Sequence, residues 1–486
     1  PEPEPEPEPQ PFELWEIIEN IESKVSKPHD GILVNNPNYI TIDGNELVAN
    51  ASNIPEGTTE TGYFALTNAI WQQKGSDIEG AIYTEHHTYF GFSVSMSSNG
   101  NIVAIGAHYD NTSGFRGGSV HVYTYSNNNW IKLGETIYGV GQFFGISVSL
   151  SSNGHILAIA SKQRGYAIIY EYKIPTDDEW NNITIVKGDD VDRIDNKYYW
   201  TKLGNIIDKV SSVDEVESVS LSSDGTIVAI GIPSNEGNEV MSNNNQPYAG
   251  NVRVFEYDNN INDWSQLGDE IVGSFKERFG HNVSLSSDGT ILAVSTRDDL
   301  DTLKGDVRIY KYSNNSWNQI GSDITGDNNG DKASQISLSE NGNILAIGAP
   351  GHSEYTGSGN YVRIFEYSND TWNQMGNDII GDNNDMLGSS VSLSTDSSII
   401  AIGGNGLTRI YKYNGSDWEK YGDDIFGASD LGNIVSISSD GLSVIVGEPY
   451  MKTSNAYSNG LVRMYSTDPI NTYYNYIVYA EPEPEP

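Results

Sequence analysis

Two short acidic segments of the chain have the residue types of a calcium site. They read Asp327-Asn328-Asn329-Gly330-Asp331 and Asp382-Asn383-Asn384-Asp385. Calcium takes about six to eight oxygen ligands, and carboxylate and amide side chains supply such oxygens. Asn, Asp and Gly also favour turns for conformational reasons alone, so a plain turn is the alternative. The predicted calcium ligands are Asp327, Asp331, Asp382 and Asp385.

Aromatic and cationic residues occur in a second set of segments, whose lengths vary along the chain. Examples are residues 107–118, 231–250, 295–305, 348–359 and 447–460. Segments of variable length on a rigid scaffold often carry ligand recognition, although they can also be ordinary solvated loops. The residues that we predict to contact a ligand are Tyr109, Arg116, Tyr248, Arg297, His352, Tyr355, Tyr450 and Tyr457.

Three asparagines are candidates for glycosylation. Asn314, Asn369 and Asn414 begin Asn-x-Ser/Thr sequons in equivalent turns before a Trp, where a glycan would fit. Asn282 also begins a sequon, but it is the first residue of a predicted inner strand and is expected to be unmodified. Sequons are about as frequent here as chance would produce in a chain so rich in Asn, so glycosylation stays a prediction.

Motifs of known catalytic machinery are missing from the sequence. It contains no Gly-rich phosphate loop, no zinc-protease helix motif and no nucleophile elbow. Glu85-His86-His87 places two histidines side by side, but neighbouring residues of a strand point in opposite directions. We therefore predict that the protein is not an enzyme. The alternative is a glycan-cleaving hydrolase or lyase whose carboxylates converge on a central channel.

Composition argues against nucleic acid as a partner and against sites that need cysteine or a membrane-spanning helix. The formal net charge of −39 disfavours nucleic acid, because the protein would repel phosphate groups. The 486 residues include no cysteine, so neither disulfides nor thiolate metal sites exist. No run of apolar residues reaches the length of a membrane-spanning helix.

Alternating Pro and Glu residues occupy both ends of the chain, at residues 1–11 and 481–486. Such tracts stay extended as polyproline II, so they predict stiff spacers with a globular unit between them. Residues 12–63 are predicted to form a small appendage, with a helix over residues 14–21 and a hairpin turning at Asp43-Gly44. Residues 468–480 are predicted to be a C-terminal strand or extension.

A repeat governs the region from residue 64 to residue 467. The pattern Trp-x-x-x-Gly-x-x-Ile recurs with Trp at seven positions, and an alternating strand, a tight turn and two further strands follow each copy. The turns are mostly Asn-Gly or Asp-Gly, which suit two-residue hairpin turns. Each unit is therefore predicted to be one four-stranded antiparallel blade of a β-propeller. The seven tryptophans are Trp71, Trp130, Trp200, Trp264, Trp317, Trp372 and Trp418.

The phase of the repeat predicts how the ring closes. Trp71 stands before the first hairpin, whereas no Trp follows the last third strand at residues 461–465. The Trp71 strand must then complete the seventh blade, which leaves no open sheet edge. The fold class is thus predicted to be an all-β, seven-bladed propeller closed by its N-terminal outer strand. In each Ser-Val-Ser-Leu inner strand, Val and Leu are expected to face one neighbouring blade and Ser the other.

Several blades resemble a known repeat. Phe90-Gly91, Phe144-Gly145 and Phe279-Gly280, with Gly348-Ala349-Pro350 ending a second strand, are similar to the FG-GAP repeat of integrin α-subunit propellers. That resemblance covers most of the chain and implies an extracellular adhesion or recognition propeller. Some members bind calcium in the first hairpin turn through Asp-x-Asp-x-Asp-Gly. Here that turn is shortened to Ser-Ser-Asp-Gly, so those family metal sites do not carry over.

These observations predict a non-enzymatic propeller on the outside of a cell or on the surface of a virion. Its variable loops would serve recognition or adhesion, with a protein or glycan as the partner. The main alternative is a structural role in a virion coat or surface appendage, where the partners would be further copies of the chain. The insertion between Tyr172 and Trp200 is a further candidate docking segment.

Overall fold

The structure is a computed structural model that contains β-strands and no helix among the residues it describes. Nor do these residues include a helix of the length and hydropathy needed to cross a bilayer. The described residues are 32–34, 40–43, 46–49, 59–66, 69–82, 86–139, 143–173, 185–187, 192–194, 200–208, 215–233, 249–274, 276–296, 304–328, 331–351, 360–382, 385–427, 433–452, 458–467 and 473–479.

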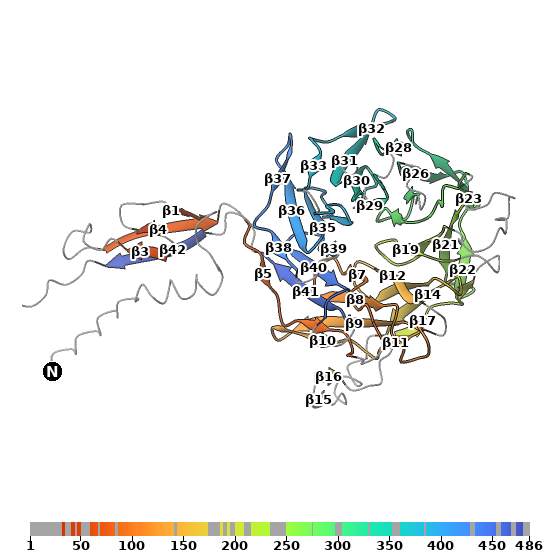
Figure 1. Ribbon diagram of the computed structural model, residues 1–486, viewed down its shortest axis with the longest axis horizontal. Coiled ribbons are helices and arrows are strands. Elements are labelled where there is room, and N and C mark those ends of the chain that lie inside the picture. Colours follow the sequence, from red (N-terminus) through yellow and green to blue (C-terminus); the bar gives the residue numbers. More distant parts are fainter. Residues whose placement is uncertain are drawn as a thin grey trace, which may run out of the picture. The chain divides into compact units, whose positions relative to one another are not determined.

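Seven antiparallel sheets follow one another around a ring, which confirms the seven-bladed propeller (Figure 1). Blade 1 holds β7 (Ser93–Met96), β8 (Ile102–Ala107), β9 (Ser119–Ser126), β10 (Asn129–Lys132) and β11 (Ile137–Tyr138). Blade 2 holds β12 (Phe144–Leu150), β13 (Ile156–Ser161), β14 (Tyr166–Tyr172), β17 (Trp200–Lys202) and β18 (Ile207–Asp208). Blade 3 holds β19 (Ser218–Leu221), β20 (Ile227–Ile232), β21 (Asn251–Asp258), β22 (Asp263–Gln266) and β23 (Ile271–Val272).

The remaining blades repeat this order. Blade 4 holds β24 (Val283–Leu285), β25 (Ile291–Ser295), β26 (Asp306–Ser313), β27 (Ser316–Gln319) and β28 (Ile324–Thr325). Blade 5 holds β29 (Gln335–Leu338), β30 (Ile344–Ala349), β31 (Tyr361–Ser368), β32 (Thr371–Gln374) and β33 (Ile379–Ile380). Blade 6 holds β34 (Ser390–Leu393), β35 (Ile399–Gly404), β36 (Leu407–Tyr413), β37 (Trp418–Lys420) and β38 (Ile425–Phe426). Blade 7 holds β39 (Ile434–Ile437), β40 (Ser443–Glu448), β41 (Leu461–Ser466), β5 (Gln72–Gln73) and β6 (Ile78–Glu79).

The inner strands pack as their alternation predicts. Val148 and Leu150 of blade 2 lie in one buried cluster with Val120 and Leu133 of blade 1. Between them, Ser149 points the other way, and its hydroxyl accepts the backbone N–H of Leu221 in blade 3 at 3.0 Å. An innermost strand has no neighbour on its inner edge, so its N–H groups need such a partner. The small serines therefore hold each inner strand to the next blade.

Each Trp of the repeat lies in the outer part of a joint between blades. Its Nε1–H donates to a backbone carbonyl in the preceding blade, directly before the Gly of the repeat, at 2.7–3.2 Å. This bond explains the spacing Trp-x-x-x-Gly, because a side chain at Gly204 would meet the ring of Trp264 at 2.8 Å. The seven donor and acceptor pairs are Trp71 with Tyr421, Trp130 with Lys74, Trp200 with Leu133, Trp264 with Leu203, Trp317 with Leu267, Trp372 with Ile320, and Trp418 with Met375.

In the Asp-Gly hairpin turns, the Asp carboxylate accepts hydrogen bonds from residues of its own turn. In blade 4 the hydroxyl of Ser286 donates to Asp288 Oδ1 at 2.7 Å, and the N–H of Thr290 donates to the same oxygen at 3.0 Å. The Ser286 hydroxyl in turn accepts the N–H of Ile291 at 2.9 Å. The Asp therefore completes the turn by its own hydrogen bonds.

The ring closes where the sequence predicts. β6 pairs with the third strand of blade 7, with Ile78 opposite Val462 and Glu79 opposite Leu461. The N–H of Lys74 also donates to the carbonyl of Met464 at 2.7 Å. Segments almost four hundred residues apart thus form one sheet, and its outer edge is covered.

Further strands lie outside the regular blades, in the predicted appendage, in the C-terminal extension and in the insertion after Tyr172. β1 (Ile32–Val34), β4 (Thr59–Leu66) and β42 (Tyr473–Tyr479) form a separate three-stranded sheet, while β2 (Ile40–Asp43) and β3 (Glu46–Ala49) form a hairpin. The predicted helix at residues 14–21 lies outside the described residues. In the insertion after Tyr172, β15 (Ile185–Lys187) and β16 (Asp192–Ile194) extend the sheet of blade 1 through β10.

Candidate binding site on the loop face

The propeller has two faces, and we call the one with the variable second-to-third strand loops the loop face. The connections that enter each blade lie on this same face. Of the predicted ligand-contacting residues, Tyr109, Arg116 and Tyr450 are described by the structure. The other five lie outside the described residues: Tyr248, Arg297, His352, Tyr355 and Tyr457.

An aromatic cluster occupies the loop face where blades 7, 1 and 2 meet. Tyr89 lies at its centre, with ring centroids 4.8 Å from Tyr109 and 5.2 Å from Tyr450. Tyr109 contacts Phe143 at 5.2 Å, and His108 packs beside both tyrosines. Four loops that are distant in sequence thus meet here, and they bring the described predicted residues together. We call this set the aromatic sector: Tyr89, His108, Tyr109, Arg116, Phe143 and Tyr450.

Arg116 provides the cation of the aromatic sector. Its guanidinium lies 4.7 Å from the ring centroid of Tyr109, 5.7 Å from that of Phe143 and 5.0 Å from that of Phe115. Cation–π contacts of this kind stabilise both partners. The ring of Phe115 itself is 66% exposed, so it is available to a partner.

The loop that carries Arg116 is fixed by its own hydrogen bonds. Buried Asp110 accepts the N–H of Thr112 at 2.9 Å and the hydroxyl of Ser119 at 2.7 Å. Asn111 Oδ1 accepts the N–H of Arg116 at 2.6 Å. A loop that is already ordered loses little conformational entropy when it binds a ligand.

Burial keeps Tyr89, His108 and Tyr450 of the sector uncharged at physiological pH. Burial raises the pKa of the Tyr89 phenol, and the neighbouring Tyr109 acts in the same direction against Arg116. Burial also raises the pKa of Tyr450, with Tyr89 and Tyr109 adding to it. The pKa of His108 is lowered to about 3, first by burial and then by Lys162 and Arg116, so this imidazole is neutral.

The central channel opens on the loop face into a cavity of about 440 Å³, which we call the mouth cavity. The second residue of every inner-strand repeat forms its apolar wall: Val94, Val148, Val219, Val283, Ile336, Val391 and Val435. Phe92 and Ile146 add to the apolar lining, and the ring of Phe92 contacts His108 at 4.1 Å between centroids. The mouth cavity therefore adjoins the aromatic sector.

Three charged or titratable side chains line another part of the mouth cavity. Glu217 of blade 3 accepts Lys162 of blade 2 at 2.5 Å, and its second oxygen lies 3.4 Å from Nδ1 of His281 in blade 4. Burial works to raise the pKa of Glu217, but the hydrogen bonds and charges of His281 and Lys162 outweigh it, so the pKa lies well below its ordinary value. Glu217 is thus a carboxylate at neutral pH.

The sequence did not predict this cluster, although one signal for it existed. Glu217 and His281 each stand directly before the first residue of the inner-strand repeat in their blades. In blade 6 the same position is Ser389. A charged or titratable residue at an otherwise neutral repeat position is a departure that a search of the repeats could find. Glycosidases use a pair of carboxylates, whereas Glu217 is the one carboxylate among the described residues lining the mouth cavity.

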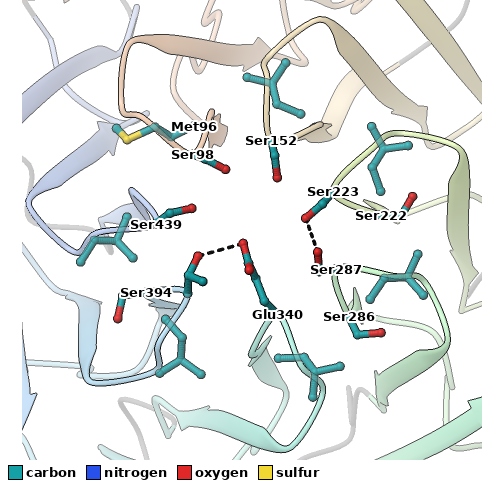
Figure 2. A pocket seen from close by; sticks show the side chains of 17 residues that line it. Met96, Ser98, Ser152, Ser222, Ser223, Ser286, Ser287, Glu340, Ser394 and Ser439 are labelled. Carbon is teal, nitrogen blue, oxygen red and sulfur yellow. Dashed lines mark hydrogen bonds between the residues drawn. The ribbon is translucent and has the colours of Figure 1, made fainter.

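The opposite end of the channel holds a smaller cavity of about 220 Å³ (Figure 2). Here the hairpin turns of the seven blades meet, and Figure 2 shows Ser98, Ser152, Ser223, Ser287 and Glu340 pointing inward. Backbone hydrogen bonds link neighbouring turns, including Ser439 N–H to Ser98 O at 2.9 Å between the last blade and the first. This end is therefore polar, and a ring of Leu, Met and Ile separates it from the middle of the channel.

The predicted calcium ligands lie where the acidic connections enter blades 5 and 6, and arginines contact three of them. Asp327 pairs with Arg363 at 2.5 Å. Asp385 and Asp382 pair with Arg409 at 2.8 and 3.5 Å. These arginines lie on the third strands β31 and β36.

Asp331, the fourth predicted ligand, is buried and accepts the hydroxyl of Tyr361 at 3.0 Å. The described residues contain no group of three or more His, Asp or Glu side chains placed to hold a metal ion. A calcium ion at either connection would have to displace the arginine or tyrosine donors. Calcium binding at these residues stays a prediction.

The three candidate glycosylation sites lie in exposed turns between third and fourth strands. Asn314 and Asn369 have positive φ angles of 52° and 53°, as tight hairpin turns require. Asn414 Oδ1 accepts the N–H of Ser416 at 2.9 Å. By contrast, Asn282 donates to the carbonyl of Ser334 at 3.1 Å inside the mouth cavity.

The Phe-Gly and Gly-Ala-Pro elements meet at the joints between blades. The rings of Phe90, Phe144 and Phe279 are fully or almost fully buried. Gly280 has φ +95°, and a side chain at Gly231 of the preceding blade would lie 2.1 Å from the Gly280 carbonyl. The same contact joins Gly447 of blade 7 to Gly91 of blade 1. Both positions thus need glycine, so the two elements function as one repeated joint.

A family model agrees with this geometry, matching residues 69–123 as an FG-GAP repeat. The chain is an FG-GAP-like β-propeller. Propellers with this repeat are typically binding or structural proteins without enzymatic activity. A search of curated proteins finds no match to this FG-GAP-like chain.

Solved structures that are similar to this FG-GAP-like propeller have low sequence identity. A candidate 6-phosphogluconolactonase from Bacteroides uniformis is 14% identical with a TM-score of 0.47, covering 70% of this chain and 86% of its own. The β-propeller domain of Myceliophteria thermophila Cps50 (Swd1) is 12% identical with a TM-score of 0.48, covering 80% and 99%. A protein from Lactobacillus plantarum is 12% identical with a TM-score of 0.47, covering 70% and 86%.

Proposed function

We propose that the protein is an extracellular recognition module on the surface of a cell or a virion. It binds a protein ligand through the aromatic sector. The observation that carries this proposal is the exposed Phe115 beside Arg116 and Tyr109, on the same face as the variable loops. Aromatic and arginine side chains are the residues that most often dominate binding energy in protein interfaces. The FG-GAP likeness supports an extracellular binding role.

The ordered loop and the electrostatics of the sector support the same function. Asp110 and Asn111 hold Arg116 in place before any ligand arrives. Tyr89 and Tyr450 stay neutral, so they present apolar rings with hydroxyl groups at their edges. Such side chains give contact area at a low cost in conformational entropy.

Site-specific photo-crosslinking tests this function. We expect benzoylphenylalanine in place of Phe115 to yield one crosslinked adduct of defined mass when the protein is illuminated with the cells or particles that carry it. The adduct should disappear in the Tyr109→Ala and Arg116→Ala backgrounds, because both side chains form the contact surface around residue 115.

The matched control places the same photo-reactive group at Ile380, which is 70% exposed on the equivalent short outer strand β33 of blade 5. No adduct is expected there. Equal adducts from both positions, or none from position 115, would contradict recognition by the aromatic sector. An adduct with twice the mass of the chain would instead favour the structural alternative, in which copies of the chain assemble.

A further inference from the structure

We propose that the mouth cavity binds one neutral sugar residue, such as the terminal hexose of a glycan. The lining of the mouth cavity adjoins the aromatic sector but shares no residue with it, so the proposal does not depend on the protein ligand proposed above. Its volume of about 440 Å³ falls in the range of about 300–1,000 Å³ that small-ligand sites occupy.

The charged groups beside the mouth cavity are already paired with one another. Lys162 lies 2.5 Å from Glu217 and 3.8 Å from Glu215, and Glu217 also faces His281, so each charged group of the cluster already has a partner of opposite charge. It nevertheless offers an acceptor and donors, because the carboxylate oxygens accept and the ammonium group donates. A sugar hydroxyl can donate and accept at once, and it therefore matches such a pair without adding a charge.

Gln335 and Asn282 extend the hydrogen-bonding part of the lining. Each amide combines a carbonyl oxygen with an NH₂ group, so it can also bind a hydroxyl in either direction. Asn282 lines the mouth cavity, and its side-chain NH₂ group donates to the carbonyl of Ser334, which holds the amide in place. These groups come from blades 2 to 5, while the apolar groups Phe92 and Ile146 come from blades 1 and 2.

The apolar part of the lining supplies the second argument. A pyranose ring has C–H groups on its faces and hydroxyls around its edge, so it needs apolar surface and polar partners together. The Val and Ile ring with Phe92 gives the apolar surface, and the charged cluster gives the partners. The smaller cavity at the other end of the channel is lined by Leu, Met and Ile side chains, by Ser and Thr hydroxyls and by Glu340, and no cation is among its described lining residues.

Binding of free monosaccharides, measured by saturation-transfer NMR on the full chain, tests the proposal. The probes are glucose, galactose, mannose, fucose and N-acetylglucosamine, with glucuronate and glucosamine as charged counterparts. We expect at least one neutral probe to bind with a Kd of about 1 mM, and we expect Glu217→Gln to weaken it by about tenfold or more. The charged counterparts should bind more weakly, because the charged groups of the cluster are already paired with one another.

The matched control is Glu340→Gln, the same substitution in the same channel at its other end, and it should leave the Kd unchanged within about twofold. Glu217→Gln should still fold, because Glu215 lies 3.8 Å from Lys162 and remains as its partner. Gln335→Met provides a second variant without an ion pair, and it should also weaken the sugar by about tenfold.

Three results would overturn the proposal. The first is no binding of any neutral probe at about 10 mM, ten times the expected Kd. The second is binding that Glu217→Gln and Gln335→Met leave unchanged, or that Glu340→Gln weakens equally. The third is preferential binding of glucuronate or glucosamine, which would show that the site selects a charged sugar and not a neutral one. None of these results bears on the crosslink at position 115.

Discussion

Replacing Trp264 with alanine is expected to lower the free energy of unfolding by about 3–5 kcal/mol. Trp264 is 9% exposed and packs against the face of Gly204 in the preceding blade. Its Nε1–H donates to the carbonyl of Leu203 at 2.7 Å, and the ring also contacts Tyr257. The substitution removes this buried volume and leaves the carbonyl without its partner, and the two losses add. Urea unfolding of both proteins measures the difference.

Two controls identify the cause of that loss. Trp264→Phe keeps most of the ring and loses the hydrogen bond, so its cost should be smaller, about 1–3 kcal/mol. Phe115→Ala removes an aromatic ring that is 66% exposed and should cost less than about 0.5 kcal/mol. A cost below about 1 kcal/mol for Trp264→Ala would contradict the role of the seven tryptophans as joints between blades.

Acidification from pH 7.5 to pH 5 should remove about 4 kcal/mol of stability through two buried histidines, about 2 kcal/mol each. The pKa of both His108 and His121 is lowered to about 3, mainly by burial. Lys162 and Arg116 add to the effect at His108, and Lys132 adds to it at His121 against Asp110. Below the ordinary pKa of about 6.5 the unfolded chain binds a proton at each position and the fold does not. This stability is therefore complete above pH 6.5 and is lost as the pH falls toward 3.

The measurement is the free energy of unfolding in urea at several pH values between 5 and 7.5. His108→Gln and His121→Gln should each remove about half of the histidine contribution to the pH dependence. Phe115→Ala, which removes no titratable group, should leave the dependence unchanged. If the two buried variants keep the slope of the parent protein, the histidines are not held neutral by burial.

Much of the fold could be predicted from the repeat, because the spacing Trp-x-x-x-Gly corresponds to one contact between neighbouring blades. Trp-x-x-x-Gly predicted the outer strand, and the structure shows the bond and the close contact that require it. The phase of Trp71 against the last blade predicted the closure seen between β6 and β41. A fifth short strand in each blade was not predicted. This short strand follows the Gly of the repeat. The positive φ of that Gly separates it from the fourth strand in the structure, whereas the sequence pattern suggests one continuous strand.

The candidate site followed only in part, because its residues come from different blades. The variable loops located Tyr109, Arg116 and Tyr450 on one face, but no pattern in the sequence links them to Tyr89 or Phe143. The acidic connections were interpreted as calcium ligands from their spacing alone. Their arginine partners, Arg363 and Arg409, lie on third strands more than 20 residues further along the chain, and only the blade geometry brings them together.

The most direct test of the closed ring is a disulfide across the closing strands. The chain has no cysteine, so Glu79→Cys combined with Leu461→Cys introduces one pair at directly opposed positions of β6 and β41. Asp306→Cys with Thr325→Cys is the matched control, because these residues oppose each other in the equivalent strands β26 and β28 of blade 4. A closed ring predicts complete intramolecular oxidation of both pairs, with the 79–461 chain migrating faster in a non-reducing gel. Free thiols or dimers at 79 and 461, while the control pair closes, would contradict it.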